Sequence, residues 1–195
     1  MNFDTSTLTS PPFLIGAAVV LLIIVIAAIF AAQLHKNKTA ELRARFGPEY
    51  DLVLAEDRSA RKAEARLLAR EKRVQGLRIR ELTEPERAHY LAEWATIQSR
   101  FVDHPRGSVT DADELIGTVL QTRGYPGGGF EQRAEDMSVN HCHLVGPYRS
   151  AYAITSRAGR NESTTEELRN AMIHYRTILE ELLHTTAPRE QRMVA

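Results

Sequence analysis

Cysteine is almost absent from this chain. Cys142 is the only cysteine among 195 residues, so an intrachain disulfide framework is excluded. No CxxC pair exists either, and structural zinc sites usually take four His or Cys ligands. The cysteine content therefore argues against both disulfide-stapled folds and thiolate-rich zinc folds.

Strand signals are scarce as well. No segment alternates β-branched and polar residues with a clean period of two, whereas apolar residues recur at helical spacing over most of the chain. We therefore expect an all-α fold made of one N-terminal transmembrane helix, a charged juxtamembrane helix and a small helical bundle.

Charge is missing from one long stretch. Between Phe13 and Leu34 lie 22 residues, and Gln33 is the only polar one. A helix of this length reaches roughly 33 Å, enough to cross a hydrocarbon core of about 30 Å. A signal peptide has a basic leader and a shorter apolar segment, and a soluble core helix has a polar face. We predict a transmembrane helix over 13–34, after a short polar N-terminus over 1–12.

The flanks of this run predict its orientation. No Lys or Arg precedes it, whereas Lys36, Lys38, Arg43 and Arg45 follow it. Basic flanks stay on the cytoplasmic side of a membrane. We therefore expect a single-pass protein of the cell inner (plasma) membrane, with the N-terminus outside and the C-terminal domain in the cytoplasm.

The net charge of zero conceals two regions of opposite sign. Residues 36–80 hold 13 Lys or Arg against 7 Asp or Glu, whereas residues 81–195 hold 12 against 17. We interpret 36–80 as a basic juxtamembrane helical stalk near anionic lipid headgroups. Residues 81–186 are expected to form the helical bundle domain, and 187–195 a flexible tail.

The stalk is rich in good helix formers from Glu49 to Val74. Val53, Ala60, Leu67 and Val74 recur every seven residues, but many companion positions are charged. This pattern favours a long solvated helix, with coiled-coil pairing as the alternative. No aromatic side chain interrupts the basic helix from Arg58 to Arg80, so specific nucleic-acid recognition is not expected.

The bundle region shows helix starts, apolar faces and one glycine-rich connector. Thr83 and Glu86 predict a capping box, and Ser163 with Glu166 or Thr164 with Glu167 predicts another. Asn140 is a further candidate cap, and Gly146-Pro147 predicts a kink or restart in the helix that follows it. RGYPGGGF, residues 123–130, is interpreted as a linker. Three apolar faces are expected: Tyr90, Trp94, Ile97 and Phe101; Val109, Ala112, Leu115, Ile116, Val119 and Leu120; and Leu168, Met172, Tyr175, Leu179 and Leu182.

Four stretches carry a resemblance to known proteins: FGPEYD, WATIQSRFVDHP, RGYPGGGFEQRAEDMSVNH and TTEELRNAMIHYRTILEELL. Over residues 46–183 the chain resembles a family of uncharacterised bacterial proteins with one N-terminal span and a C-terminal helical domain. The resemblance implies this architecture and no activity, substrate or cofactor. The family pattern resembles S-V-D-H-P where this chain has Ser138 to His143, so the His-Cys-His cluster is particular to this chain.

His141, Cys142 and His143 are the candidate metal ligands, because imidazole and thiolate bind zinc or copper. Neighbours one and two apart on a helix point in different directions, however. The alternative interpretation is a helix start with incidental histidines, and no metal or cofactor site is predicted. Aromatic residues at helical spacing are interpreted as core, and no catalytic constellation surrounds Cys142.

These observations give two functional expectations. The first is a membrane-anchored, non-catalytic interaction or scaffold protein that recruits a protein partner. The alternative is a membrane-tethered ligand-binding or metal-binding domain, with or without an enzymatic activity, that uses His141, Cys142 and His143.

Overall fold

The computed structural model describes residues 11–184, apart from the side chains of residues 11–19, 31, 34 and 35. Within that range the chain is helical and contains no strand, which confirms the all-α fold class. The predicted tail 187–195 and most of the predicted polar N-terminus lie outside the described residues. The chain divides into an N-terminal unit, residues 1–44, and a C-terminal unit, residues 45–195.

Helix α1, Pro11–Phe46, makes up the described part of the N-terminal unit, and its last two residues belong to the C-terminal unit. Its large apolar side chains from Val20 to Phe30 are exposed, with relative exposures between 45% and 65%. Among the described residues, no helix is both long enough and apolar enough to cross a membrane.

The C-terminal unit begins with helices α2, Pro48–Asp57, and α3, Ala60–Gln75. A single long solvated helix over 49–74 was therefore the wrong prediction, because the chain breaks at Arg58, which adopts a left-handed φ of 52°. Val53, Leu67 and Val74 are buried, and the two helices pack on each other and on α6 and α7. Three of the four residues at the seven-residue spacing are thus buried within this chain, whereas Ala60 is exposed.

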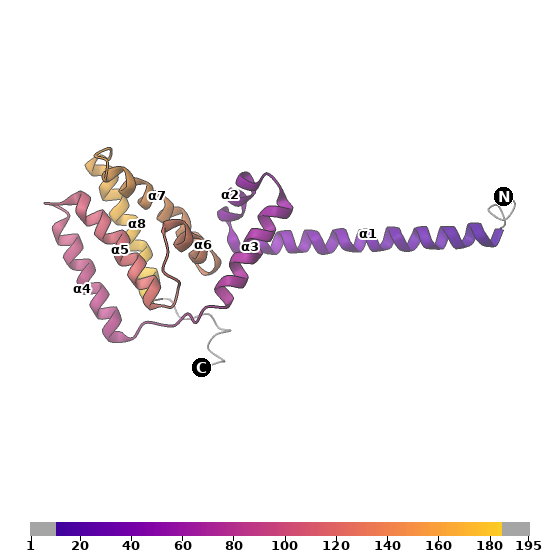
Figure 1. Ribbon diagram of the computed structural model, residues 1–195, viewed down its shortest axis with the longest axis horizontal. Coiled ribbons are helices and arrows are strands. Elements are labelled where there is room, and N and C mark those ends of the chain that lie inside the picture. The colour runs from indigo at the N-terminus through magenta and orange to yellow at the C-terminus, as the bar shows by residue number, and fades with distance from the viewer. Residues whose placement is uncertain (1–10, 185–195) are drawn as a thin grey trace. The chain divides into compact units, whose positions relative to one another are not determined.

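The remaining helices are α4, Glu84–Arg100; α5, Pro105–Thr122; α6, Phe130–Asn140; α7, Cys142–Ala158; and α8, Thr165–His184. Figure 1 shows α5, α7 and α8 side by side, with α4 on the outer side of α5. The predicted apolar faces of α5 and α8 are buried, as are Tyr90, Trp94 and Ile97 of α4. Phe101 is half-buried.

The helix starts agree with the sequence in two cases and differ in one. Thr83 and Glu86 form the predicted capping box, and Thr164 with Glu167 forms the second, because the Glu167 amide donates to Thr164 Oγ1 at 3.2 Å. Asn140 caps no helix; it is the last residue of α6, and its amide nitrogen donates to the Tyr125 hydroxyl at 3.2 Å. Helix α7 continues through Pro147 as one element.

The glycine-rich connector between α5 and α6 is not a plain linker. Arg123 and Tyr125 are buried, and the Arg80 amide donates to the Arg123 carbonyl at 2.8 Å. Gly124 has a φ of 100°, and a Cβ at this position would lie 2.3 Å from the Arg78 carbonyl oxygen. Only glycine fits there, because both the conformation and the close approach exclude a side chain.

Candidate functional site

The candidate metal ligands lie at the junction of α6 and α7. His141 is buried at 3% exposure, whereas His143 is 61% exposed. Their ring centroids are 6.5 Å apart, and each ring lies about 4 Å from a Glu181 carboxylate oxygen, at 4.0 and 3.8 Å. Burial, followed by the nearby charges of Arg123 and His143, lowers the pKa of His141 to about 4. His141 therefore stays neutral at pH 7.

No metal-binding group follows from this arrangement. Across the described residues, no cluster of three or more His, Cys, Asp or Glu side chains could hold an ion. Cys142 is half-buried, and its Sγ lies 3.9 Å from where a Cβ on Gly47 would stand. The metal alternative thus has no described ligand set to support it.

A larger cluster of charged residues lies where α3 meets α2, α6 and α7. Arg70 contacts Glu49 of α2 and Glu135 of α6, both at 2.9 Å. Arg73 contacts Asp136 at 2.7 Å and Glu135 at 3.1 Å. These contacts fix α3 against helices that are far away in the sequence.

Helix α7 adds a further arginine to this cluster. Arg149 joins Glu49 at 3.1 Å and Glu131 at 3.0 Å, so the Glu49 carboxylate accepts from both Arg70 and Arg149. We call Glu49, Arg70, Arg73, Glu131, Glu135, Asp136 and Arg149 the charged cluster.

Burial makes the pairing in the charged cluster necessary. The side chains of Arg70 and Glu49 are only 4% and 3% exposed, and a buried charge without a partner strongly destabilises a fold. Burial alone raises the pKa of Glu135, but the charge of Arg70 and the hydrogen bonds from Arg73 and Arg70 lower it overall. Glu135 therefore remains ionised near neutral pH.

A second buried ion pair lies between α5 and α6. Arg133 donates to Asp113 at 2.6 Å, and its guanidinium carbon lies 5.9 Å from the centre of the Tyr148 ring. A Cβ on Gly117 would lie 2.6 Å from Arg133 Nη1. Burial raises the pKa of Tyr148, so its phenol stays protonated beside this pair. The arrangement holds helices together, and it exposes no reactive group to solvent.

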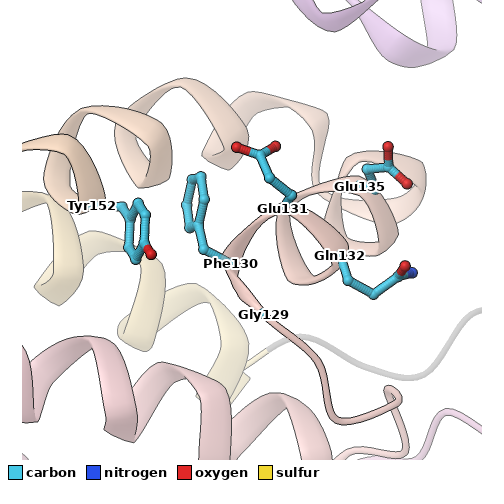
Figure 2. A pocket seen from close by; sticks show the side chains of 6 residues that line it. All are labelled: Gly129, Phe130, Glu131, Gln132, Glu135 and Tyr152. Carbon is cyan, nitrogen blue, oxygen red and sulfur yellow. The ribbon is translucent and has the colours of Figure 1, made fainter. Parts of the chain in front are cut away.

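An open pocket of about 610 Å³ adjoins the charged cluster. Its lining residues are Gly129, Phe130, Glu131, Gln132, Glu135 and Tyr152. Phe130 and Tyr152 stack with ring centroids 3.8 Å apart and planes 1° apart. Figure 2 shows the two rings facing each other at one end of the pocket, with Gln132 and Glu135 at the other.

The acidic groups that line the pocket already have partners. Glu131 is engaged by Arg149 and Glu135 by Arg70. A general base needs a carboxylate that can reach a substrate proton, and no nucleophilic Ser, Cys or Lys lines this pocket.

The sequence analysis missed the charged cluster, although one signal for it was present. Arg70 lies on the helical face of α3 that also carries Leu67 and Val74, and all three are buried. An arginine at a core position of an amphipathic helix predicts a buried acidic partner. The partners themselves lie 21 to 65 residues away, beyond the reach of helical periodicity.

No family model, curated protein or solved structure matches this chain. The resemblance to bacterial single-span proteins stays a prediction. The functional assignment therefore rests on the residues of this chain.

Proposed function

We propose that this protein is a membrane-anchored, non-catalytic helical interaction protein. In this proposal α1 crosses the bilayer once and the C-terminal unit recruits or organises a protein partner. The observation that carries the proposal is the uncharged run from Phe13 to Leu34, within which the large apolar side chains from Val20 to Phe30 are exposed.

Apolar side chains that are exposed on every side of a helix are stabilised when an apolar environment replaces water around them. Each large aliphatic side chain gains about 1.5–3 kcal/mol when it leaves water. The side chains from Ile23 to Ile26 are all at least 45% exposed, and four consecutive residues point to every side of a helix. A single packing partner covers one face only, whereas lipid hydrocarbon surrounds the whole helix. The hydrocarbon core of a bilayer is therefore the proposed environment.

The flanking charges support the proposed topology. Lys36 and Lys38 follow the run and are exposed, which favours a cytoplasmic C-terminal unit at the inner (plasma) membrane. The resemblance to bacterial single-span proteins supports the same single-pass arrangement. The pocket beside the charged cluster is a candidate contact surface for the partner.

The anchor and its orientation can be tested together in cells that produce the full chain. Alkaline carbonate should leave the chain in the membrane pellet, and release into the supernatant would exclude a bilayer-spanning anchor.

Because Cys142 is half-buried, a Cys142→Ser, Ala95→Cys variant places the only thiol at an exposed site on α4. A membrane-impermeant maleimide should label this thiol only after permeabilisation. Labelling of intact cells would reverse the topology.

The scaffold part of the proposal has its own test. Purification of the full chain in mild detergent should return the same partner in independent preparations. Tyr152→Ala should lose that partner, whereas Ile173→Ala, at an exposed site on α8, should retain it. A chain that is monomeric and binds no protein would contradict the scaffold role, and equal loss from both variants would exclude the pocket as the contact.

A further inference from the structure

The arginines and lysines of α3 fall into two groups with different surroundings. Arg66, Arg70 and Arg73 each contact at least one carboxylate on another helix. The other side of α3 carries Arg61, Ala65, Leu68 and Lys72, at spacings of four, three and four. Lys62 lies about 100° round the helix from Arg61, between this side and Arg66. We call these five residues the basic stripe.

The basic stripe is exposed along its whole length. Within residues 11–184 the structure gives Arg61, Lys62 and Lys72 no acidic partner. The two acids of α3 itself are engaged elsewhere, since Glu64 accepts from the Tyr50 hydroxyl and Glu71 pairs with Arg45. Arg61 and Lys72 thus face solvent on the side of α3 away from Arg70, and Lys62 faces solvent between them and Arg66.

We propose that the basic stripe lies on the anionic lipid headgroups of the membrane that α1 crosses. This inference rests on the proposed function, because the anchor brings the stripe to the membrane. Arg61 follows the end of the apolar run by 27 residues, so the tether holds the stripe at high effective concentration near the headgroups. Basic segments next to a membrane anchor are attracted to the negative cytoplasmic leaflet.

The composition of the stripe favours lipid over nucleic acid. Leu68 is 50% exposed in the middle of the cations, where an aliphatic side chain can enter the boundary between headgroups and acyl chains. Single-stranded nucleic acids are instead held by aromatic side chains on which bases stack, and α3 contains no aromatic residue.

The size of the effect follows from the number of charges. Each Lys or Arg at an anionic surface contributes about a fivefold preference for the membrane-bound state. Removal of all three cations should therefore lower the ratio of membrane-bound to free stripes by roughly a hundredfold. Ions at high salt concentration screen such contacts over a few ångströms.

The test uses the full chain reconstituted into vesicles with its only thiol at Ala65→Cys in a Cys142→Ser background. The thiol carries an environment-sensitive dye, and nitroxide-labelled headgroup lipids quench it on contact. We expect strong quenching in vesicles of phosphatidylcholine with 30% phosphatidylserine, and little in phosphatidylcholine alone. A salt concentration of about 0.5 M should abolish the quenching. The same dye at Ala95→Cys on α4 should not be quenched in either vesicle.

Matched charge variants separate the stripe from net charge. Arg61→Gln, Lys62→Gln and Lys72→Gln together should remove the quenching. Arg106→Gln, Arg169→Gln and Arg176→Gln change the net charge equally at exposed sites on α5 and α8 and should leave it intact. Quenching independent of phosphatidylserine, or equal loss in both triple variants, would overturn the proposal.

Two further outcomes are distinguishable. Failure of the chain to float with phosphatidylcholine vesicles would refute the anchor, whereas normal flotation without serine-dependent quenching would refute only the stripe. Tight binding of a homopolymeric RNA that needs Arg61, Lys62 and Lys72, and that phosphatidylserine vesicles do not displace, would assign the stripe to nucleic acid instead. The salt dependence of the unsubstituted stripe needs no charge variant, so the proposal stays testable if a variant misfolds.

Discussion

The two units of this chain use the same aliphatic residues in opposite ways. In α1 the Leu, Ile and Val side chains between Val20 and Ile29 are largely exposed, whereas Leu67, Ile116 and Leu179 in the C-terminal unit are at most 1% exposed. The difference lies in the polar residues between them. A helix whose apolar residues alternate with charges every three to four positions has a face to bury. The stretch of α1 from Val20 to Phe30 contains no charge and therefore shows no such division into two faces.

Charges placed inside the uncharged run should have the largest effect. Ile23→Lys with Ile26→Lys should abolish membrane retention, because each lysine near the bilayer centre costs about 2.5–3.5 kcal/mol. Carbonate extraction measures the retention. Ile23→Leu with Ile26→Leu is the control that keeps the run apolar, and both variants should leave the unfolding of the C-terminal unit unchanged. A lysine variant that stays in the membrane pellet would contradict the anchor.

The C-terminal unit contains buried charged side chains, and the loss of a partner of such a side chain should destabilise the unit. Arg70→Met should destabilise this unit by about 3–5 kcal/mol, because Glu135 loses a partner and Glu49 keeps only Arg149. Arg169→Met removes an exposed pair with Glu166 and should cost less than about 1 kcal/mol. Urea unfolding of the full chain in detergent measures both. Equal effects would mean that the charged cluster contributes no more than a surface pair.

Two neighbouring leucines in α3 should sharpen the contrast between covered and exposed side chains. Leu67 is fully buried and Leu68 is 50% exposed, so Leu67→Ala should cost about 2–5 kcal/mol. Leu68→Ala should change stability by less than about 0.5 kcal/mol. Thermal or urea unfolding measures the loss of stability in each variant. A larger loss in Leu68→Ala than in Leu67→Ala would mean that α3 buries a different face in solution.

Removal of the buried His141 imidazole should have its clearest effect on the free energy of unfolding at acidic pH. The pKa of His141 is lowered from 6.5 to about 4, so between these pH values the unfolded chain binds a proton that the folded chain does not. Stability should therefore fall as pH drops through this window, by about 3 kcal/mol in total. His141→Asn should remove this dependence, whereas His143→Gln should retain most of it, because burial and the charge of Arg123 are the larger causes of the lowered pKa. An unchanged pH profile in His141→Asn would assign the acid sensitivity to other groups.

Local periodicity predicted much of the bundle. The spacing of Leu168, Met172 and Tyr175 correctly predicted the buried face of α8, and Thr83 with Glu86 correctly predicted the start of α4. These features depend on residues within one or two helical turns, which a single sequence displays directly.

The hairpin of α2 and α3 was not predictable in the same way. No Gly or Pro marks the break between the two helices at Arg58. The charged residues of α2 and α3 would be predicted to face solvent from the sequence alone, because their partners on α6 and α7 are distant in the sequence. Glu49 and Arg149 are 100 residues apart, so their contact follows from tertiary packing alone. The pocket beside Phe130 likewise forms only when α7 brings Tyr152 onto its ring.

The same separation has a consequence for how the chain is made. A ribosome adds about 5–20 residues per second, so Arg149 is synthesised about 5–20 s after Glu49. For most of that interval α6 and α7 have not been made, and α2 and α3 lack helices on which they later pack. The hairpin is thus the part of the C-terminal unit that waits longest for its neighbours. A chain whose synthesis stops before residue 149 lacks most of α7 and all of α8, so α2 and α5 are each left without a helix on which they pack.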